Sequence, residues 1–131
     1  MFELVADIES YPGFLPWCVD AKVHNRDPEM VEATLRMAKG PLRKSLTTRN
    51  RMRPPEIIEV GLLRGPFSRL QGLWRFEPAP GGGARISLGM EFEINNVILR
   101  RTLGPLFGEI ANSMVDAFCR RAREVYGGRS P

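Results

Sequence analysis

Few residues in this sequence could carry out covalent or metal chemistry. His24 is the only histidine, which argues against a catalytic triad that needs histidine and against a multi-histidine metal site. Cys18 and Cys119 lie far apart, and neither belongs to a CxxC pair or a Cys/His ligand spacing. We therefore expect both cysteines to be small buried hydrophobic residues, with metal or redox use as the alternative. We expect no metal site and no required cofactor.

General acid–base chemistry is also poorly supported. A cyclase or dehydratase would need a carboxyl group or a histidine that projects into an apolar cavity. In the strand predicted at 85–94, Glu91 and Glu93 alternate with apolar residues, so their carboxyl groups point away from the buried face. His24 lies near a loop. We expect no catalytic residue and no enzymatic activity, and a cyclase or dehydratase-like enzyme stays the alternative.

Large apolar side chains are the more promising candidates, because their types suit the binding of a hydrophobic small molecule. They lie on faces that should point between a sheet and a helix, or in loops at the mouth of that space. The candidate ligand-binding residues are Phe14, Trp17, Phe67, Trp74, Met90, Phe92, Leu106, Phe107, Ile110 and Met114. The alternative is that these residues pack as an ordinary core.

A second candidate surface is basic. Residues 33–55 include seven lysines and arginines and no acidic residue. Arg43, Arg49, Arg51 and Arg53 share the parity of one predicted strand and therefore one face. That face could contact RNA phosphates or anionic lipid headgroups. The alternative is a solvated strand face that discourages edge aggregation.

The hydrophobic pattern predicts the elements that hold these residues. A short helix at 1–8 is interrupted by Ser10-Tyr11-Pro12-Gly13. Strands are then predicted at 30–38, 56–63, 70–77 and 85–94, and a polar strand rich in serine and threonine at 42–52. From 99 to 125 apolar residues recur at helical spacing, until Gly127-Gly128 ends the helix. Gly104-Pro105 should kink this helix or mark where its long regular part begins.

The glycine-rich segment 78–83 predicts a turn between the last two strands. Pairing around it places Phe76 opposite Ile86, Trp74 opposite Leu88, and Glu77 opposite Arg85. With 131 residues the chain forms one domain, residues 1–131. We expect an α+β fold with about six antiparallel strands, in which the curved sheet wraps around one long C-terminal helix. No segment is apolar enough to span a bilayer, so a cytoplasmic location is expected.

Several sequence blocks in the right order resemble the coenzyme Q-binding START-domain family, often described as polyketide cyclase/dehydrase-like (SRPBCC). The blocks are Ser10-Tyr11-Pro12, Phe14 to Cys18, Thr47-Thr48-Arg49-Asn50, Gly65-Pro66-Phe67, Trp74 to Pro78, Met114 to Phe118, and Tyr126-Gly127. Two of these blocks, Thr47 to Asn50 and Gly65 to Phe67, are most similar to the branch of ribosome association toxins (RatA), which belong to toxin–antitoxin systems.

The resemblance implies a START-like helix-grip fold whose cavity binds ubiquinone or a related isoprenoid lipid in support of respiration. For the toxin branch it implies binding to the large ribosomal subunit and a block of subunit association. Peripheral contact with the inner membrane is consistent with a lipid ligand.

The chain departs from the family in one respect. Members usually carry a first strand before the helix that begins at Phe2, and that strand lies beside the one corresponding to 85–94. An open edge invites strand addition. We therefore expect a homodimer through this edge strand, with a misplaced start site as the alternative.

Overall fold

The computed structural model describes residues 2–126. The elements in chain order are α1 (Phe2–Ala6), a 3-10 helix η1 (Ile8–Gly13), β1 (Cys18–Asp27), β2 (Met30–Lys39), β3 (Leu42–Arg53), β4 (Ile57–Arg64), β5 (Arg69–Pro78), β6 (Ala84–Glu93) and α2 (Val97–Tyr126). All strands are antiparallel and their order in the sheet follows the sequence, from β1 to β6. The predicted α+β architecture is confirmed.

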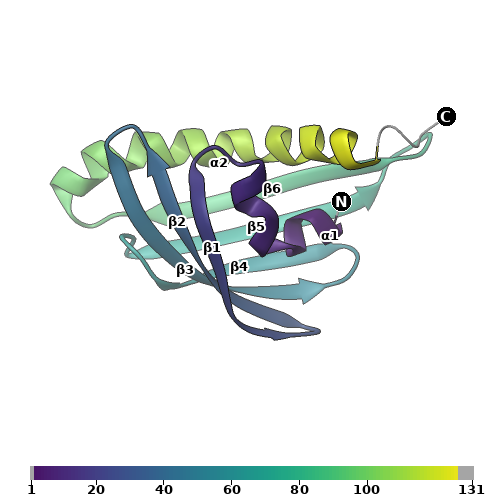
Figure 1. Cartoon of the computed structure of the whole chain (residues 1–131), viewed down its shortest axis with the longest axis horizontal. Helices are drawn as coiled ribbons and strands as arrows, with labels where there is room; N and C mark the ends of the chain where they lie inside the picture. The colour runs from purple at the N-terminus through teal and green to yellow at the C-terminus, as the bar shows by residue number, and fades with distance from the viewer. Residues whose placement is uncertain (1, 127–131) are drawn as a thin grey trace.

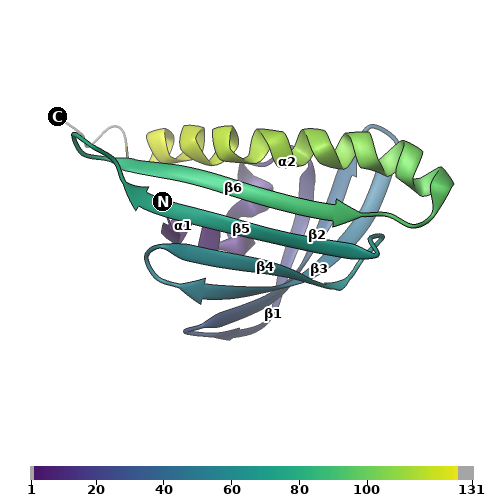
Figure 2. The same cartoon turned by 180° about the vertical axis from the view of Figure 1, so that it is seen from behind.

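The sheet curves around α2. Figure 1 shows α2 lying along the sheet, with β1, β2 and β3 steeply inclined to the later strands. Seen from behind, β4, β5 and β6 run side by side beneath the helix (Figure 2). The inner face of the sheet and the apolar face of α2 therefore close one core between them. The two edges of the sheet are β1 and β6, so the strand predicted at 85–94 is an edge strand.

The predicted pairing of β5 with β6 is confirmed residue for residue. Phe76 pairs with Ile86, Trp74 with Leu88, and Glu77 with Arg85. The turn between the two strands contains Gly81, Gly82 and Gly83, all with positive φ, a conformation that glycine adopts without steric cost. Core residues meet core residues in this register, and opposite charges meet on the other face.

The long helix α2 begins before Gly104-Pro105. One of the two predictions for this dipeptide, that it marks where the long regular helix begins, is therefore wrong. The side chain of Asn96 accepts a hydrogen bond from the Leu99 N–H at 2.9 Å, as N-cap residues do, and α2 runs from Val97 with Pro105 inside it. Pro105 therefore does not mark the start of the helix. The predicted stop at Gly127-Gly128 lies outside the described residues.

The N-terminal segment covers one end of the core. The predicted break at Ser10 to Gly13 forms the 3-10 helix η1 instead of a plain turn. Its Tyr11 is buried and donates a hydrogen bond to the Val5 carbonyl, which ties η1 to α1. Leu15 and Trp17, which follow, are buried as well, which explains why this connection is so apolar.

Candidate functional site

Five of the ten candidate ligand-binding residues belong to two aromatic groups beneath α2. In the first, Phe67 from the β4–β5 turn, Phe92 from β6 and Phe107 from α2 make a triangle. Their ring centroids are 5.8 Å apart for Phe67 and Phe92, 4.6 Å for Phe67 and Phe107, and 4.9 Å for Phe92 and Phe107. All three contacts are edge-on, the arrangement that the charge distribution of aromatic rings favours. This group joins three elements that are distant in sequence.

The second aromatic group surrounds Phe118 of α2, which is fully buried. Trp74, Tyr11 and Phe14 each pack edge-on against it, with centroid distances of 5.3, 5.3 and 5.2 Å. The guanidinium of Arg121 covers the outer face of Phe14 at 5.4 Å from the ring centroid, a cation–π contact. The predicted site contained Trp74 and Phe14 but not Phe118 or Tyr11. The helical spacing of Phe118 from Met114 and Phe107 was the signal that could have included it.

The ten candidates differ in exposure. Six are buried, namely Trp17, Phe67, Trp74, Phe107, Ile110 and Met114, and four are half-buried, namely Phe14, Met90, Phe92 and Leu106. In this conformation they pack against one another and against the rest of the core. Trp17 and Phe67, large residues in connecting segments, are each only 7% exposed. Their role in binding a ligand stays a prediction.

Two polar residues on the inner face were not among the candidates. Thr48 and Asn50 of β3 are each 6% exposed, and the Thr48 hydroxyl donates to the Asn50 Oδ1 at 3.0 Å. They alternate with the outward arginines and share their face with Leu46 and Met52, which are also buried. The parity of the strand was the available signal. The amide of Asn50 carries two N–H donors, a group that could serve a polar ligand atom.

A hollow opens beside α2, next to the first aromatic group. It encloses about 340 Å³ between the β2–β3 turn and the first turns of the helix. Its lining consists of Pro41, Arg43, Lys44, Leu99, Thr102, Leu103 and Leu106. Leu106, one of the predicted ligand-binding residues, therefore lines a space that is apolar on the helix side and basic on the hairpin side.

The basic face of β3 is less uniformly positive than the sequence suggested. Arg49 forms an ion pair with Glu32 of β2 at 2.7 Å. A hydrogen bond from Asn25 and the contact with Arg49 hold the pKa of the Glu32 carboxyl below its usual value. Arg51 pairs in register with Glu59 of β4. Acidic residues that are remote in sequence thus lie beside two of the four predicted arginines.

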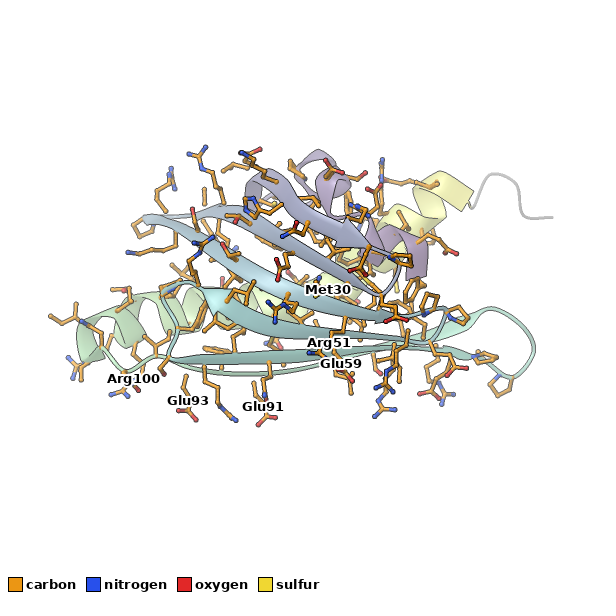
Figure 3. The ribbon with its side chains drawn as sticks, turned by 90° about the horizontal axis from the view of Figure 1, so that it is seen from below. Met30, Arg51, Glu59, Glu91, Glu93 and Arg100 are labelled. Carbon is orange, nitrogen blue, oxygen red and sulfur yellow. The ribbon has the colours of Figure 1, made fainter. Side chains whose placement is uncertain are left out.

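Figure 3 shows this outer face, with Arg51 beside Glu59 and with Glu91 and Glu93 farther along it. A shallow hollow of about 680 Å³ lies over β3 to β6 and is lined by Arg49, Arg51, Glu59 and Glu91 among others. Gly61 and Gly89 also line it, and the absence of side chains there helps to hollow the surface. Its charges are of both signs.

The histidine and the two cysteines, which are the side chains best suited to covalent or metal chemistry, do not form a cluster with acidic residues among the described residues. His24 is exposed and its Nε2 lies 2.7 Å from the Thr34 hydroxyl. Cys18 and Cys119 are free thiols, and burial raises the pKa of Cys18 to about 11, which keeps this thiol protonated near neutral pH. Between residues 2 and 126, no three His, Cys, Asp or Glu side chains are grouped so that they could hold a metal ion. No described helix is long and apolar enough to cross a membrane.

An antiparallel sheet that closes its core around a single long C-terminal helix defines the helix-grip class of folds. The chain belongs to the family described as "Polyketide cyclase / dehydrase and lipid transport", whose model matches residues 1–119. An aromatase/cyclase from Streptomyces sp. R1128, Zhui, has the same fold, with a TM-score of 0.82, 16% identity, and coverage of 95% of this chain and 86% of that one.

Two relatives are informative about function. The ribosome association toxin RatA of Pseudomonas aeruginosa is 42% identical over 97% of this chain and 88% of its own length. The mitochondrial coenzyme Q-binding protein COQ10 homolog B of Xenopus laevis is 26% identical over 97% of this chain and 54% of its own length. Both similarities extend over nearly all of the helix-grip domain.

Proposed function

We propose that this protein associates with ribosomes, as the name of its relative RatA indicates for that protein. The observation that carries the proposal is 42% identity over 97% of the chain, which includes surface as well as core positions. The 16% identity of the Streptomyces cyclase, by contrast, supports only a shared fold. The large ribosomal subunit is the partner that the family resemblance implies, and a block of subunit association is the implied consequence.

The outer face of β3 is the first surface to test as the ribosome contact. Arg51 and Arg53 are exposed there, and neither belongs to an ion pair within the described part of the chain. Arg49 is the weaker candidate, because Glu32 already binds its guanidinium. Ribosomal RNA is a dense polyanion, and each arginine that neutralises a phosphate releases counterions and strengthens binding at low salt.

Sedimentation with purified ribosomal subunits tests this proposal. We expect the unmodified protein to sediment with the large subunit, and Arg51→Glu/Arg53→Glu to lose that association. Each lost phosphate contact should reduce the dependence of log affinity on log salt by about one. The matched control is Arg85→Glu/Arg123→Glu, which changes the net charge equally but alters exposed positions on β6 and near the end of α2. Equal loss in both variants, or no binding by the unmodified protein, would contradict the proposal.

A second candidate function is the binding of ubiquinone or a related isoprenoid lipid beneath α2. The specific observation in its favour is the buried Thr48–Asn50 pair within an otherwise apolar interior. A quinone presents carbonyl oxygens that can accept from an amide N–H, while its isoprenoid tail requires apolar surroundings. The similarity to a coenzyme Q-binding protein agrees with such a ligand. Binding of this kind requires the packed aromatic groups to move apart.

Native mass spectrometry of protein purified from a quinone-producing host, followed by solvent extraction, tests the second candidate. We expect a co-purifying isoprenoid quinone, and less of it in Asn50→Leu, which keeps a similar volume but removes the amide donors. Arg85→Glu/Arg123→Glu, which alters exposed positions outside the interior, is the control and should retain the quinone. An empty protein that also fails to bind added quinone would remove this candidate and leave the ribosome proposal intact.

We propose that the interior binds and does not catalyse. The buried polar side chains on β3 are those of Thr47, Thr48 and Asn50, none of which titrates near neutral pH. The buried Tyr11 hydroxyl stays protonated, because desolvation raises its pKa far above its usual value. None of these groups could act as a general base that removes a proton from a bound polyketide. Measurable cyclisation or dehydration of a model polyketide by the purified protein would overturn this proposal.

The homodimer through the β6 edge and the cytoplasmic location stay predictions. β6 has a strand neighbour on one side only among the described residues, which leaves its other edge able to accept a strand. Sedimentation velocity together with amide exchange along 87–92 tests the dimer. A monomer whose β6 amides exchange slowly would contradict it.

A further inference from the structure

Three of the four exposed large aliphatic side chains of the described residues, those of Leu63, Val97 and Ile98, lie at one end of the molecule, whereas Val19 adjoins Cys18 and lies nearer η1. Ile98 is 77% exposed, Val19 52%, Val97 51% and Leu63 40%. Val97 and Ile98 form the first turn of α2, while Leu63 precedes the β4–β5 turn and Val19 lies beside the end of β2. Figures 1 and 2 show that the β2–β3 turn, the β4–β5 turn and the start of α2 meet at this end. Such clustering of exposed aliphatics suggests a contact surface.

Basic side chains surround these aliphatic residues. Arg100 and Arg101 follow in the same turn of α2, and Lys44 borders the hollow opposite Leu99. Figure 3 shows Arg100 at this extremity of the molecule. None of Lys44, Arg64, Arg100 and Arg101 takes part in an ion pair within residues 2–126. We call Lys44, Arg64, Val97, Ile98, Arg100 and Arg101 the α2-start surface.

The acidic residues at this end have basic partners, although Arg69 balances only one of the two carboxylates that it contacts. Glu91 and Glu93 both pair with Arg69, at 3.3 and 3.4 Å, and Glu109 pairs with Lys39 at 3.7 Å. One carboxylate charge of Glu91 and Glu93 is left over, and the four basic residues Lys44, Arg64, Arg100 and Arg101 outnumber it, so the net charge of the α2-start surface and its neighbours is positive. The opposite end differs, since Glu9 with Arg26, and Glu124 with Arg121, bring charges of both signs together there. Net attraction to an anionic partner is concentrated where the aliphatics are exposed.

We propose that the α2-start surface docks on an anionic lipid bilayer. Val97 and Ile98 would enter the boundary between headgroups and acyl chains, which removes aliphatic area from water. The four basic side chains would contact lipid phosphates in the headgroup layer. The hollow lined by Leu99, Leu103 and Leu106 opens beside this surface, so a bilayer lipid could pass from the membrane towards the interior. This inference goes beyond ribosome association and does not depend on it.

The composition of the surface favours a bilayer over RNA. Aliphatic side chains gain nothing from phosphates, and RNA recognition in single-stranded regions uses aromatic rings or arginine planes to stack on bases. The α2-start surface exposes valine and isoleucine and no aromatic residue. Burial in hydrocarbon lowers the free energy of these aliphatic side chains, and an anionic headgroup layer attracts the arginines beside them.

Vesicle flotation tests the proposal directly. We expect the protein to float with vesicles of phosphatidylcholine and phosphatidylglycerol, to bind pure phosphatidylcholine weakly, and to dissociate as salt is raised. Arg100→Glu/Arg101→Glu should lower partitioning at least about fivefold per residue changed. Val97→Ser/Ile98→Ser should lower it without altering the salt dependence. Arg85→Glu/Arg123→Glu is the matched control and should bind as the unmodified protein does.

A second measurement reports insertion itself. In a Cys119→Ser background, Ile98→Cys labelled with a polarity-sensitive dye should shift to shorter wavelength on the anionic vesicles, whereas a label at Ser87→Cys on the outer face should not. No shift, or equal loss of binding in the control double variant, would overturn the proposal. If the unmodified protein ignores vesicles and Arg100→Glu/Arg101→Glu loses ribosome association instead, the surface is a ribosome contact. The Arg51→Glu/Arg53→Glu experiment tests ribosome association through β3, and its outcome does not depend on the result with vesicles.

Discussion

The two ends of this molecule are built from similar residues but present them in opposite ways. At the end that contains η1, Tyr11, Phe14 and Trp74 enclose Phe118, and Arg121 covers the ring of Phe14. At the other end the first turn of α2 leaves Val97 and Ile98 in solvent beside unpaired arginines. Both sets of side chains are apolar and flanked by cations. The first has a short helix to cover it, and the second has none within the described residues.

The contrast indicates that apolar residues stabilise one end and remain available for contact at the other. Burial of an aromatic side chain contributes several kcal/mol to folding, whereas an exposed valine or isoleucine contributes little. Substitutions at the two ends should therefore differ in what they change, namely stability at the first and association at the second.

The largest effect is expected from Phe118→Ala. This side chain is fully buried and three aromatic rings pack against it, so its removal should leave a cavity that the surrounding groups cannot fill. We expect a loss of about 3–5 kcal/mol in the free energy of unfolding, measured by urea denaturation. Phe118→Leu should lose less of the free energy of unfolding. It should therefore stay folded even if the alanine variant does not fold. A loss below about 1 kcal/mol would show that this end is not the stabilising one.

Tyr11→Phe should have an intermediate effect. The change keeps the ring against Phe118 but removes the hydroxyl that donates to the Val5 carbonyl. A buried carbonyl without a partner costs about 1–3 kcal/mol, again measured by urea denaturation. The double variant with Phe118→Leu should show non-additive losses, because the two residues are in contact. Additive losses would indicate that Tyr11 and Phe118 stabilise the end independently.

Alkaline pH should weaken the same end. The pKa of Cys18 rises from 9.0 to about 11 on folding, and desolvation by burial is the main cause. A raised folded-state pKa stabilises the protein fully below the unfolded value, so this contribution is lost as the pH rises from about 9 through about 11. Unfolding free energies measured across this range should fall, and Cys18→Ala should remove the earliest part of the fall. Tyr11, whose pKa is also raised, accounts for the part that remains above about pH 10.

The smallest effect on stability is expected at the contact end. Ile98→Ala replaces a side chain that is 77% exposed and improves the local helix propensity, so the free energy of unfolding should change by less than about 0.5 kcal/mol. The same variant should lower partitioning to anionic vesicles. A large loss of stability at this position would mean that the α2 start is part of the folded core, and the contrast between the two ends would not hold.

Alternation within each strand was enough to predict much of the fold. In β6, Ile86, Leu88, Met90 and Phe92 share one parity, and the glycine turn before them sets the β5–β6 register that the structure has. Both features are local, since the pleat and the turn depend on residues adjacent in sequence. The candidate site was predicted less completely. Phe118 and Asn50 were omitted, although the spacing of each placed it on an inner face.

What the sequence alone determined is therefore the strands β2 to β6, the two α-helices, the faces of these strands and the family to which the chain belongs. It did not delimit β1, so His24, expected near a loop, lies within a strand. Only the tertiary structure decided which faces meet. Arg49 lies against Glu32 because β2 and β3 pair in one register, and Phe67 reaches Phe107 because the β4–β5 turn lies beneath α2. The sequence likewise could not predict that Ile98 is exposed, because a helical pattern does not show where the sheet that covers the helix ends. Contacts between distant segments depend on the packing of the whole chain, and local periodicity does not encode them.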